Sequence, residues 1–557
     1  MLESRHDDAR GQMKHSLSAV RALLKLPPSL WLLALLTLGF VLPGLFAHDP
    51  WKSFDAIGVE VIHQMRVSGD WLVPRIAGEP WLEDPPFFHW VALLLGRLLS
   101  FALPFHDAVR AASGLAVVAA CAFLYAAART SREEGDSRNE AAIAVLLLIG
   151  TIGLMVHAHE AITDLATLAA CSAALAALVR AGSRPVVMGI AFGISLGIAC
   201  LSNGFVTPVA LLAAAALSTV VCTEWRTRKG VVFLAVGTLV TAAVAASWPW
   251  ALRSHSPGLF SAWVAQAMHQ HGGFAANLRY FFGISAWFLW PLWPLALWTL
   301  WTRRRFLLSP EFFAPISAFA FLFIGVAFFG PPQDINLLAT VPPLVLFCAH
   351  GLPVLRRGVA AAFDWFGVMT FGFFSILIWG GYIAMMTGWP PKVANNFAKL
   401  APGFVPHFAW LPFVTALALT ALWLTLILRL PYAPARSATR WAAGVVLFWG
   451  TFATLWMPWA DHIKTYRNVA LQLKSNLPAG NDCVAGRNFG VPQRAALSYH
   501  AELRILGPQA ESRCRFLVVQ GTPKHERDAP GAGWTKIADV GRSGDKAERF
   551  RLYRKDQ

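Results

Sequence analysis

The chain has 557 residues, of which 56% are hydrophobic and only 14% are charged, and it contains 24 Trp. A soluble protein of this length carries more charge and divides into several domains, so this composition excludes an ordinary soluble enzyme. The net charge of +16 does not indicate nucleic-acid binding, because the basic residues lie in short connections and in the C-terminal tail, without an aromatic–basic stripe. They fit an anionic membrane surface.

Apolar runs long enough to cross a bilayer repeat along the chain, since about 20 apolar residues span roughly 30 Å of hydrocarbon. The connections between them alternate. Every second connection carries at least two basic residues, as in Arg303–Arg305, and the short turns between the others carry none. Cytoplasmic loops hold the excess of Lys and Arg. We therefore predict a cytoplasmic N-terminus (residues 1–29) and a transmembrane domain (residues 30–457) with about thirteen spans. The predicted spans are 30–47, 109–128, 139–156, 161–180, 185–201, 204–222, 231–252, 282–301, 311–329, 334–350, 359–386, 408–429 and 440–457.

A long outer connection, residues 48–108, follows the first predicted span. Its stretch Phe87–Pro104 is apolar but contains His89 and Arg97, and a crossing there would move every later Arg cluster to the other side of the membrane. We predict an interfacial or half-inserted helix instead. A loop of this length is either functional or disordered, and its many aromatic residues and prolines argue against disorder.

The tail, residues 458–557, is charged and is predicted to lie outside. Helical periodicity covers Lys464–Leu477, and three short segments have strand composition. The tail is therefore predicted to form a small α/β domain. Cys483 and Cys514 would form a disulfide if the tail is outside, and no cysteine spacing typical of a metal site occurs. The predicted strands are Asp482–Ala485, Leu503–Leu506 and Phe516–Val519.

Several motifs resemble lipid-linked-sugar glycosyltransferases of the GT-C fold, above all the lipid A aminoarabinose transferases and the related protein mannosyltransferases. The likeness extends in order from about residue 30 to 350, and its most specific part is the first outer loop. The motifs that carry it are Ser68–Arg75, Gly78–Trp81, Glu83–Trp90, Ile162–Leu165, Leu201–Phe205 and Val341–Leu344.

The resemblance implies a polytopic α-helical protein of a bacterial inner membrane, with its α/β tail domain in the periplasm. It also implies an inner-membrane glycosyltransferase that moves a sugar from a polyprenyl-phosphate donor to lipid A or another envelope acceptor. The partners would be that donor, the acceptor and membrane lipids, with no nucleic acid. A carboxylate near the sugar would act as a base for a hydroxyl acceptor, or would orient a phosphate acceptor.

The resemblance implies two catalytic carboxylates, Asp55 and Asp164. Asp164 matches the carboxylate of the second outer loop. For the first loop, an ungapped count places Asp55 at the second residue of an Asp-Glu pair, and a one-residue deletion would make it the first; both alignments stay open. Asp55 would otherwise cap the helix that follows it, and Asp164 would otherwise form a salt bridge. His157, His159 and Glu160 crowd the same outer turn as Asp164 and are weaker candidates.

The donor phosphate needs cationic or backbone donors. Two lysines of the family pattern are replaced here, by Asp84 and by Asn203. The resemblance places both at the phosphate site, and a transferase must supply another cation near Glu83–Asp84 or Asp164. We expect Arg75 or Arg279 in this role, although Lys52, Arg66 and Arg253 are also available.

A metal is the other way to supply that cation. Glu83 matches a family residue that can share a metal with a histidine of a later outer loop, which would be His269 or His271 here. A carboxylate and an imidazole would suit zinc. The missing lysines leave an alternative function open, namely a catalytically degenerate relative that binds lipid or a protein partner. A transporter is disfavoured because no internal repeat is visible.

Overall fold

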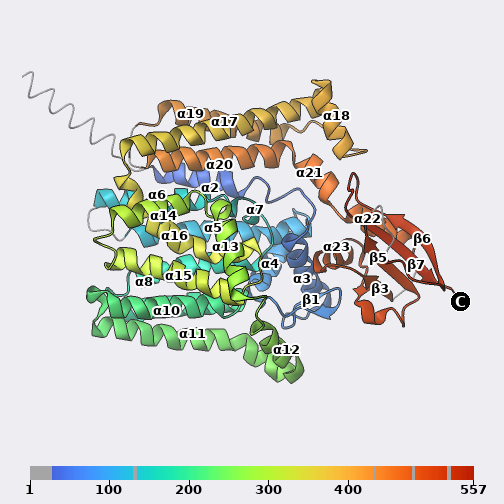
Figure 1. Cartoon of the computed structure of the whole chain (residues 1–557), viewed down its shortest axis with the longest axis horizontal. Helices are drawn as coiled ribbons and strands as arrows, with labels where there is room; N and C mark the ends of the chain where they lie inside the picture. Colours follow the sequence, from blue (N-terminus) through green and yellow to red (C-terminus); the bar gives the residue numbers. More distant parts are fainter. Residues whose placement is uncertain are drawn as a thin grey trace, which may run out of the picture.

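The structure is a computed structural model that describes residues 28–556 except 130–133, 432, 434, 479–482 and 523–527. A bundle of helices forms most of the molecule, and a small domain with a β-sheet sits at one end of it (Figure 1). We call this the domain-side end of the bundle. The bundle helices are α2 (Leu30–Val41), α5 (Phe105–Ala128), α6 (Glu134–Ile149), α7 (Leu154–His157), α8 (Thr163–Leu178), α9 (Pro185–Asn203), α10 (Val206–Val221), α11 (Arg228–His255), α12 (Pro257–Ala267), α13 (Phe274–Phe288), α14 (Leu292–Thr302), α15 (Pro310–Phe329), η2 (Asp334–Thr340), α16 (Val341–Gly351), η3 (Leu352–Val354), α17 (Arg357–Thr387), α18 (Pro391–Leu400), α19 (Trp410–Arg429) and α20 (Arg436–Leu455).

The helices make this a multi-pass membrane protein. In the described residues, seven helices are long and apolar enough to cross a membrane, or up to nine if each bent pair of helices is one span. Every predicted span contains a helix, but several are short, so the count of thirteen crossings stays a prediction. One predicted span, 282–301, is not continuous: α13 and α14 meet at 96°. Pro291, which lacks a backbone N–H, stands at the start of α14.

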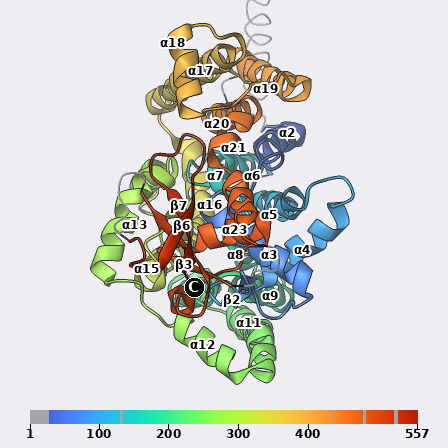
Figure 2. The same ribbon diagram turned by 90° about the vertical axis from the view of Figure 1, so that its right-hand side faces the viewer.

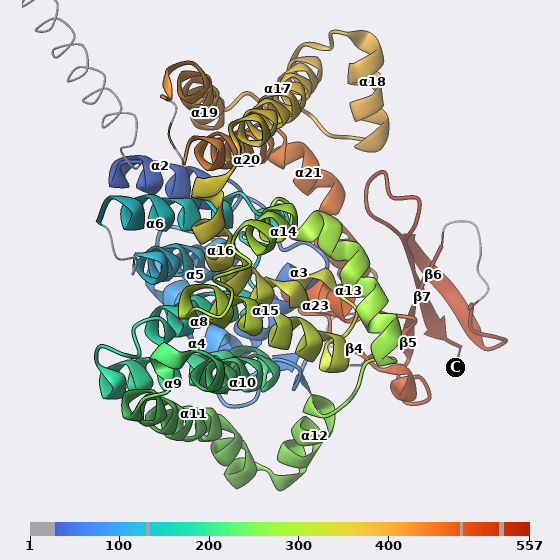
Figure 3. The same cartoon turned by 60° about the vertical axis from the view of Figure 1, so that its left-hand side comes forward.

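The bundle is layered. Figure 3 shows α17, α18, α19 and α20 grouped on one side and α10 and α11 on the opposite side, with α8 and α16 between them. α16 lies in the centre, where every one of its residues is buried. Alanine and leucine dominate the core around it. Because the interior is apolar, the charged residues that it contains must be paired.

The long connection between α2 and α5 is ordered. It contains α3 (Phe54–Ser68), the short antiparallel pair β1 (Arg75–Ile76) and β2 (Glu79–Pro80), and α4 (Phe87–Leu99). The predicted helix at Phe87–Pro104 is therefore present as α4. Its 13 residues extend about 20 Å, too short to cross roughly 30 Å of hydrocarbon. Gly96 lets α4 approach α5 closely, because a Cβ there would lie 2.8 Å from Val109 Cγ1.

The C-terminal domain has the predicted α/β character. Its five strands lie in the order β4-β3-β5-β7-β6, with β3, β4 and β5 parallel and with β7 antiparallel to both β5 and β6. Cys483 and Cys514 form the predicted disulfide. The elements α23, β6 and β7 were not predicted from the sequence. The elements are α21 (Met457–Lys464), α22 (Arg467–Ser475), β3 (Val484–Arg487), α23 (Val491–Ala501), β4 (Ile505–Leu506), β5 (Phe516–Gly521), β6 (Trp534–Val540) and β7 (Arg549–Lys555).

The domain is fastened to the long first connection by α23, which lies over α3 at the domain-side end (Figure 2). Polar contacts reinforce this packing. Lys52 Nζ lies 2.8 Å from Glu548 Oε1, and Arg494 Nη2 lies 2.5 Å from Glu79 Oε2. Residues 48–104 are therefore held between the bundle and the domain, and they close one side of the cavity described below.

Candidate functional site

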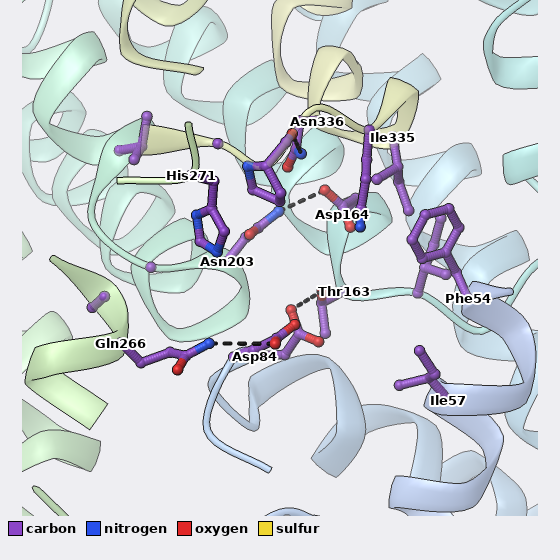
Figure 4. A pocket seen from close by; sticks show the side chains of 18 of the residues that line it. Phe54, Ile57, Asp84, Thr163, Asp164, Asn203, Gln266, His271, Ile335 and Asn336 are labelled. Atoms are coloured by element: carbon purple, nitrogen blue, oxygen red, sulfur yellow. Dashed lines mark hydrogen bonds between the residues drawn. The ribbon is translucent and has the colours of Figure 1, made fainter. Parts of the chain in front are cut away.

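A cavity of about 550 Å³ opens at the domain-side end of the bundle. Its walls come from α3, from the loop before α4, from the first turn of α8, from the turn between α9 and α10, from α12 and the loop after it, and from η2. Two residues of α23, Val491 and Pro492, complete the lining. Figure 4 shows side chains from these distant segments facing one another. The cavity is therefore assembled by the fold from segments more than 400 residues apart.

Five of the eight main candidate residues meet on this cavity wall, namely Glu83, Asp84, Asp164, Asn203 and His269, and the alternative metal ligand His271 lines it as well. They come from the loop before α4, the loop after α12, the start of α8 and the end of α9. The predicted partners Asp55, Arg75 and Arg279 are not among the described lining residues. The individual roles assigned to all eight residues stay predictions.

Asp84 is held by two hydrogen bonds. Trp81 Nε1 donates to its Oδ2 at 3.2 Å. Thr163 Oγ1 donates to its Oδ1 at 3.2 Å (Figure 4). Burial raises the pKa of Asp84 above its ordinary value. Both carboxylate oxygens already have a donor, so the geometry makes Asp84 a fixed part of the wall. Trp81 and Thr163 belong to motifs singled out in the sequence, but their contacts with Asp84 were not predicted.

Glu83 lies beside Asp84, and its Oε1 accepts a hydrogen bond from Gln266 Nε2 at 3.3 Å. Partial burial, followed by repulsion from Asp84, raises the pKa of Glu83 to about 7. Glu83 therefore changes its charge near neutral pH, which makes the charge of the cavity sensitive to pH.

Asp164 lies in the first turn of α8, where the positive end of the helix dipole favours a negative side chain. Asn203 Nδ2 donates to its Oδ1 at 2.6 Å (Figure 4). Asn203 is the last residue of α9, and the chain then turns at Gly204, whose φ of +75° suits glycine. The turn thus directs the Asn203 amide at the Asp164 carboxylate.

Positive charge is scarce on the cavity wall. No Lys or Arg occurs among the described lining residues, and the basic side chains there are His89, His269 and His271. Arg75 pairs with Asp70 at 3.5 Å, and Arg279 is exposed on α13. The expected compensating arginine is thus not present on the described wall.

A charged histidine lies close by. His157 Nδ1 is 2.6 Å from Glu160 Oε2, and His157 Nε2 is 3.6 Å from Asp334 Oδ2. Burial alone would lower the pKa of His157, but the two carboxylates raise it to about 10. His157 is therefore protonated at neutral pH. Because it already faces two carboxylates, this cluster adds no net positive charge beside the cavity.

The residues do not provide a preformed zinc site. The rings of His269 and His271 are 5.0 Å apart, but His271 Nδ1 donates to the Phe329 carbonyl at 3.2 Å. Within the described part of the chain, no three or more His, Cys, Asp or Glu side chains are grouped to hold a metal ion. Glu83 and His269 alone fall short of the three protein ligands of typical catalytic zinc sites.

Asp55 is buried and does not face water. Its Oδ2 lies 2.7 Å from Arg110 Nη2, and its Oδ1 accepts a hydrogen bond from Ala161 N at 2.8 Å. Arg110 also donates to Asp107 Oδ1 at 2.9 Å. Burial would raise the pKa of Asp55, but Arg110 holds it below its ordinary value. Arg110 was not among the residues selected from the sequence. Its position inside the predicted span 109–128 could have identified it, because a charged residue within a span is usually functional or paired.

Asp55 nevertheless contacts the cavity wall, because it accepts a hydrogen bond from the backbone amide of Ala161, which lines the cavity. Ala161, which donates to Asp55, lies three residues before Asp164. α3 packs against this segment so closely that a Cβ on Gly58 would lie 1.7 Å from the Ala161 carbonyl oxygen. In this structure, Asp55 therefore positions the segment that carries Asp164.

No family model matches the chain, and no curated protein sequence matches it. Its structure is similar to that of ArnT, a lipid A aminoarabinose transferase, from Cupriavidus metallidurans. In the apo state the TM-score is 0.66 at 17% identity, and in the state bound to undecaprenyl phosphate it is 0.68 at 18% identity. Both alignments cover 94% of this chain and 97% of ArnT. A complex of the oligosaccharyltransferase AglB from Archaeoglobus fulgidus with an inhibitory peptide and a dolichol-phosphate aligns at a TM-score of 0.44 and 12% identity, over 88% of this chain and 69% of AglB. The chain has the GT-C fold, as its motifs predicted.

Proposed function

We propose that this protein transfers a sugar from a polyprenyl-phosphate donor to lipid A or another acceptor of the cell envelope. The single observation that carries the proposal is the cavity with Asp84 and Asp164 on its wall, in a fold that aligns over 94% of the chain with ArnT. One ArnT structure holds undecaprenyl phosphate, and this supports a polyprenyl phosphate as the donor's carrier.

Asp164 is the residue that we assign to acceptor activation. In the reaction, the acceptor oxygen forms a bond to C1 of the sugar while the bond between C1 and the donor phosphate oxygen breaks. The polyprenyl phosphate leaves with the electron pair. A hydroxyl acceptor gives its proton to the carboxylate, whereas an ionised phosphate acceptor has none to give and is oriented instead. Asp84 accepts hydrogen bonds at both oxygens, and through Thr163 it fixes the loop before α4 to the start of α8.

The reaction would take place on the periplasmic face of a bacterial inner membrane. Two observations support this side. The Arg-rich connections alternate with connections that lack Lys and Arg, and the disulfide Cys483–Cys514 belongs in an oxidising compartment. The C-terminal domain that carries the disulfide also contributes Val491 and Pro492 to the cavity.

A second function is favoured by one observation, the absence of Lys and Arg from the described cavity wall. An anionic phosphate next to Glu83 and Asp84 would meet like charge, at a cost on the order of several kcal/mol at a few Å and an effective dielectric of about 20. A catalytically degenerate relative that binds a neutral lipid or a protein partner needs no such cation.

The test uses the purified full-length protein in nanodiscs with a radiolabelled polyprenyl-phosphate sugar and bacterial lipid A. Transfer of label to the acceptor, lost by about two to four orders of magnitude in Asp164→Asn, is the expected result. Glu502→Gln is the matched control, because Glu502 is exposed at the end of α23 and does not line the cavity. A protein that binds the donor but transfers no label would be the degenerate relative. Full transfer by Asp164→Asn would remove Asp164 from the mechanism.

A further inference from the structure

A second polar cavity, of about 420 Å³, lies at the end of the bundle away from the C-terminal domain. It is formed by η3, the first turns of α17, the end of α19 and the start of α20. Figure 1 shows α17, α19 and α20 running side by side along one edge of the bundle. The side chains that give it charge are Asp364 of α17 and Arg436 and Arg440 of α20. None of these residues takes part in the site at the domain-side end.

The two arginines are placed on one face of α20, because residues four apart on a helix are neighbours. Both meet the same oxygen: Arg436 Nε lies 3.3 Å from Asp364 Oδ2, and Arg440 Nη1 lies 3.4 Å from it. These distances exceed the 2.7–2.9 Å of a strong charge-assisted hydrogen bond. One carboxylate therefore neutralises the charge of one of the two guanidinium groups, and both of its contacts are longer than strong ion-pair hydrogen bonds.

Hydrogen-bonding capacity is left over in the cluster. Within the described residues, Arg436 Nε, Arg440 Nε and Asp364 Oδ1 are buried and have no hydrogen-bond partner. Arg440 does donate to the Ile427 carbonyl through Nη2. A buried polar atom without a partner is costly, and a buried cation more so. The described residues that line the cavity thus carry a net charge of one positive unit, which a singly charged anion would balance.

The position of the cavity indicates which anion fills it. Asp364 lies seven residues into α17, about 10 Å along the helix from Arg357. Trp365 lines the same cavity and is 66% exposed, as expected for a tryptophan at the boundary between lipid and water. Beyond it, the exposed face of α17 is apolar, with Met369 and Phe373 67% and 59% exposed. A ligand there can place a charged group between the arginines and an acyl chain along α17.

We propose that this cavity binds the phosphate group of a monoanionic membrane phospholipid, in the leaflet opposite the C-terminal domain. Basic pockets between transmembrane helices bind anionic headgroups in this way. The phosphodiester oxygens accept hydrogen bonds from Arg436 and Arg440, and the acyl chains lie against Trp365 and the apolar face of α17. The proposal is independent of sugar transfer, because it concerns the other end of the bundle.

The experiment titrates the delipidated full-length protein, in detergent, with dioctanoyl phosphatidylglycerol and counts bound lipid by native mass spectrometry. Dioctanoyl phosphatidylcholine has the same tails and the same phosphodiester but no net charge. It should bind at least about tenfold more weakly, because the two arginines repel its choline cation. Arg436→Gln should weaken phosphatidylglycerol binding by about tenfold. Arg429→Gln, which removes an exposed arginine at the end of α19 outside the cavity, should change it by less than about twofold.

A variant that binds the lipid more tightly is also needed, because misfolding can explain a loss of binding but not a gain. Asp364→Asn removes the competing carboxylate and should tighten phosphatidylglycerol binding by several-fold, on the order of one charge-assisted contact. Equal affinity for the two lipids, or unchanged affinity in Arg436→Gln, would overturn the proposal. Competition by millimolar inorganic phosphate as strong as that by the lipid would also overturn it, by showing a site for a soluble anion.

Discussion

Arg110 Nη2 lies 2.7 Å from Asp55 Oδ2, and the two side chains are 0% and 1% exposed. The pair joins α3 to α5, and through the Ala161 amide it also fixes the segment before Asp164. Removing one partner of a buried ion pair leaves the other charge unpaired, which is far more costly than losing an exposed pair. The residue expected to be a catalytic acid is therefore also a structural one.

We predict that Asp55→Asn lowers the free energy of unfolding by about 3 kcal/mol or more. The measurement is thermal unfolding in detergent, followed by intrinsic tryptophan fluorescence. Asp70→Asn is the matched control, because Asp70 forms a partly exposed pair with Arg75 at 3.5 Å and should cost no more than about 1 kcal/mol. Equal stability of the two variants would contradict the buried-pair interpretation. Transfer activity must be compared at a temperature at which both variants are folded.

Glu60 gives a pH-dependent prediction. It is fully buried on α3, its Oε1 accepts from Gln64 Nε2 at 2.8 Å, and its Oε2 has no hydrogen-bond partner among the described residues. Burial raises the pKa of Glu60 from 4.5 to about 7. Because the folded protein holds this proton more tightly than the unfolded chain, the associated stability is complete below pH 4.5 and is lost as the pH rises to about 7.

The wild-type protein should therefore lose about 2 to 3 kcal/mol of stability from this group between pH 5 and pH 8. Glu60→Gln, which carries no charge, should lack this loss and be the more stable protein at pH 8. Chemical unfolding of both proteins across that range is the measurement. A pH profile unchanged by the substitution would show that Glu60 does not hold the proton.

Glu83 should control how well the cavity accepts an anion. Its pKa is raised to about 7 by burial and by Asp84, so lowering the pH from 8 to 6 removes a negative charge from the wall. The affinity for undecaprenyl phosphate should rise over this interval. Glu83→Gln should raise the affinity at pH 8 and flatten its dependence on pH. The gain should be at most about tenfold, because a carboxyl with a pKa of about 7 can take up a proton at pH 8 instead of repelling the anion.

Binding of labelled undecaprenyl phosphate at each pH is the measurement for Glu83. Glu502→Gln again serves as the control, since it removes an exposed acid outside the cavity. A pH dependence that is unchanged in Glu83→Gln would mean that another group, rather than Glu83, takes up the proton.

Topology is tested with two single cysteines at exposed positions, Ala532→Cys in the C-terminal domain and Arg304→Cys in the connection between α14 and α15. In intact cells whose outer membrane has been permeabilised, a membrane-impermeant maleimide should label position 532 and not position 304. The reason is the alternation of Arg-rich connections. Labelling of both positions from the same side would refute the alternation, and labelling of neither would be checked in lysed cells.

Part of the candidate site could be predicted from short motifs. Asp84, Asp164 and Asn203 lie in separate motifs whose family resemblance predicts a shared site, and the cavity does bring them together. Their immediate partners were not predicted, because Thr163 and Trp81 act through their orientation toward Asp84, and orientation depends on how α8 packs beside the loop before α4.

The sequence by itself determined the class of this protein. The lengths of its apolar runs require a helical membrane bundle, because every backbone polar group in hydrocarbon must be satisfied within a helix. The change of composition after residue 457 marked the α/β domain. Only the tertiary structure decided that Asp55 is paired with Arg110, that α13 and α14 meet at a sharp angle, and that the cavity wall is acidic. The physical reason is that the energy of a charge depends on its burial and its partner, and Asp55 finds its partner 55 residues away through the packing of α3 against α5.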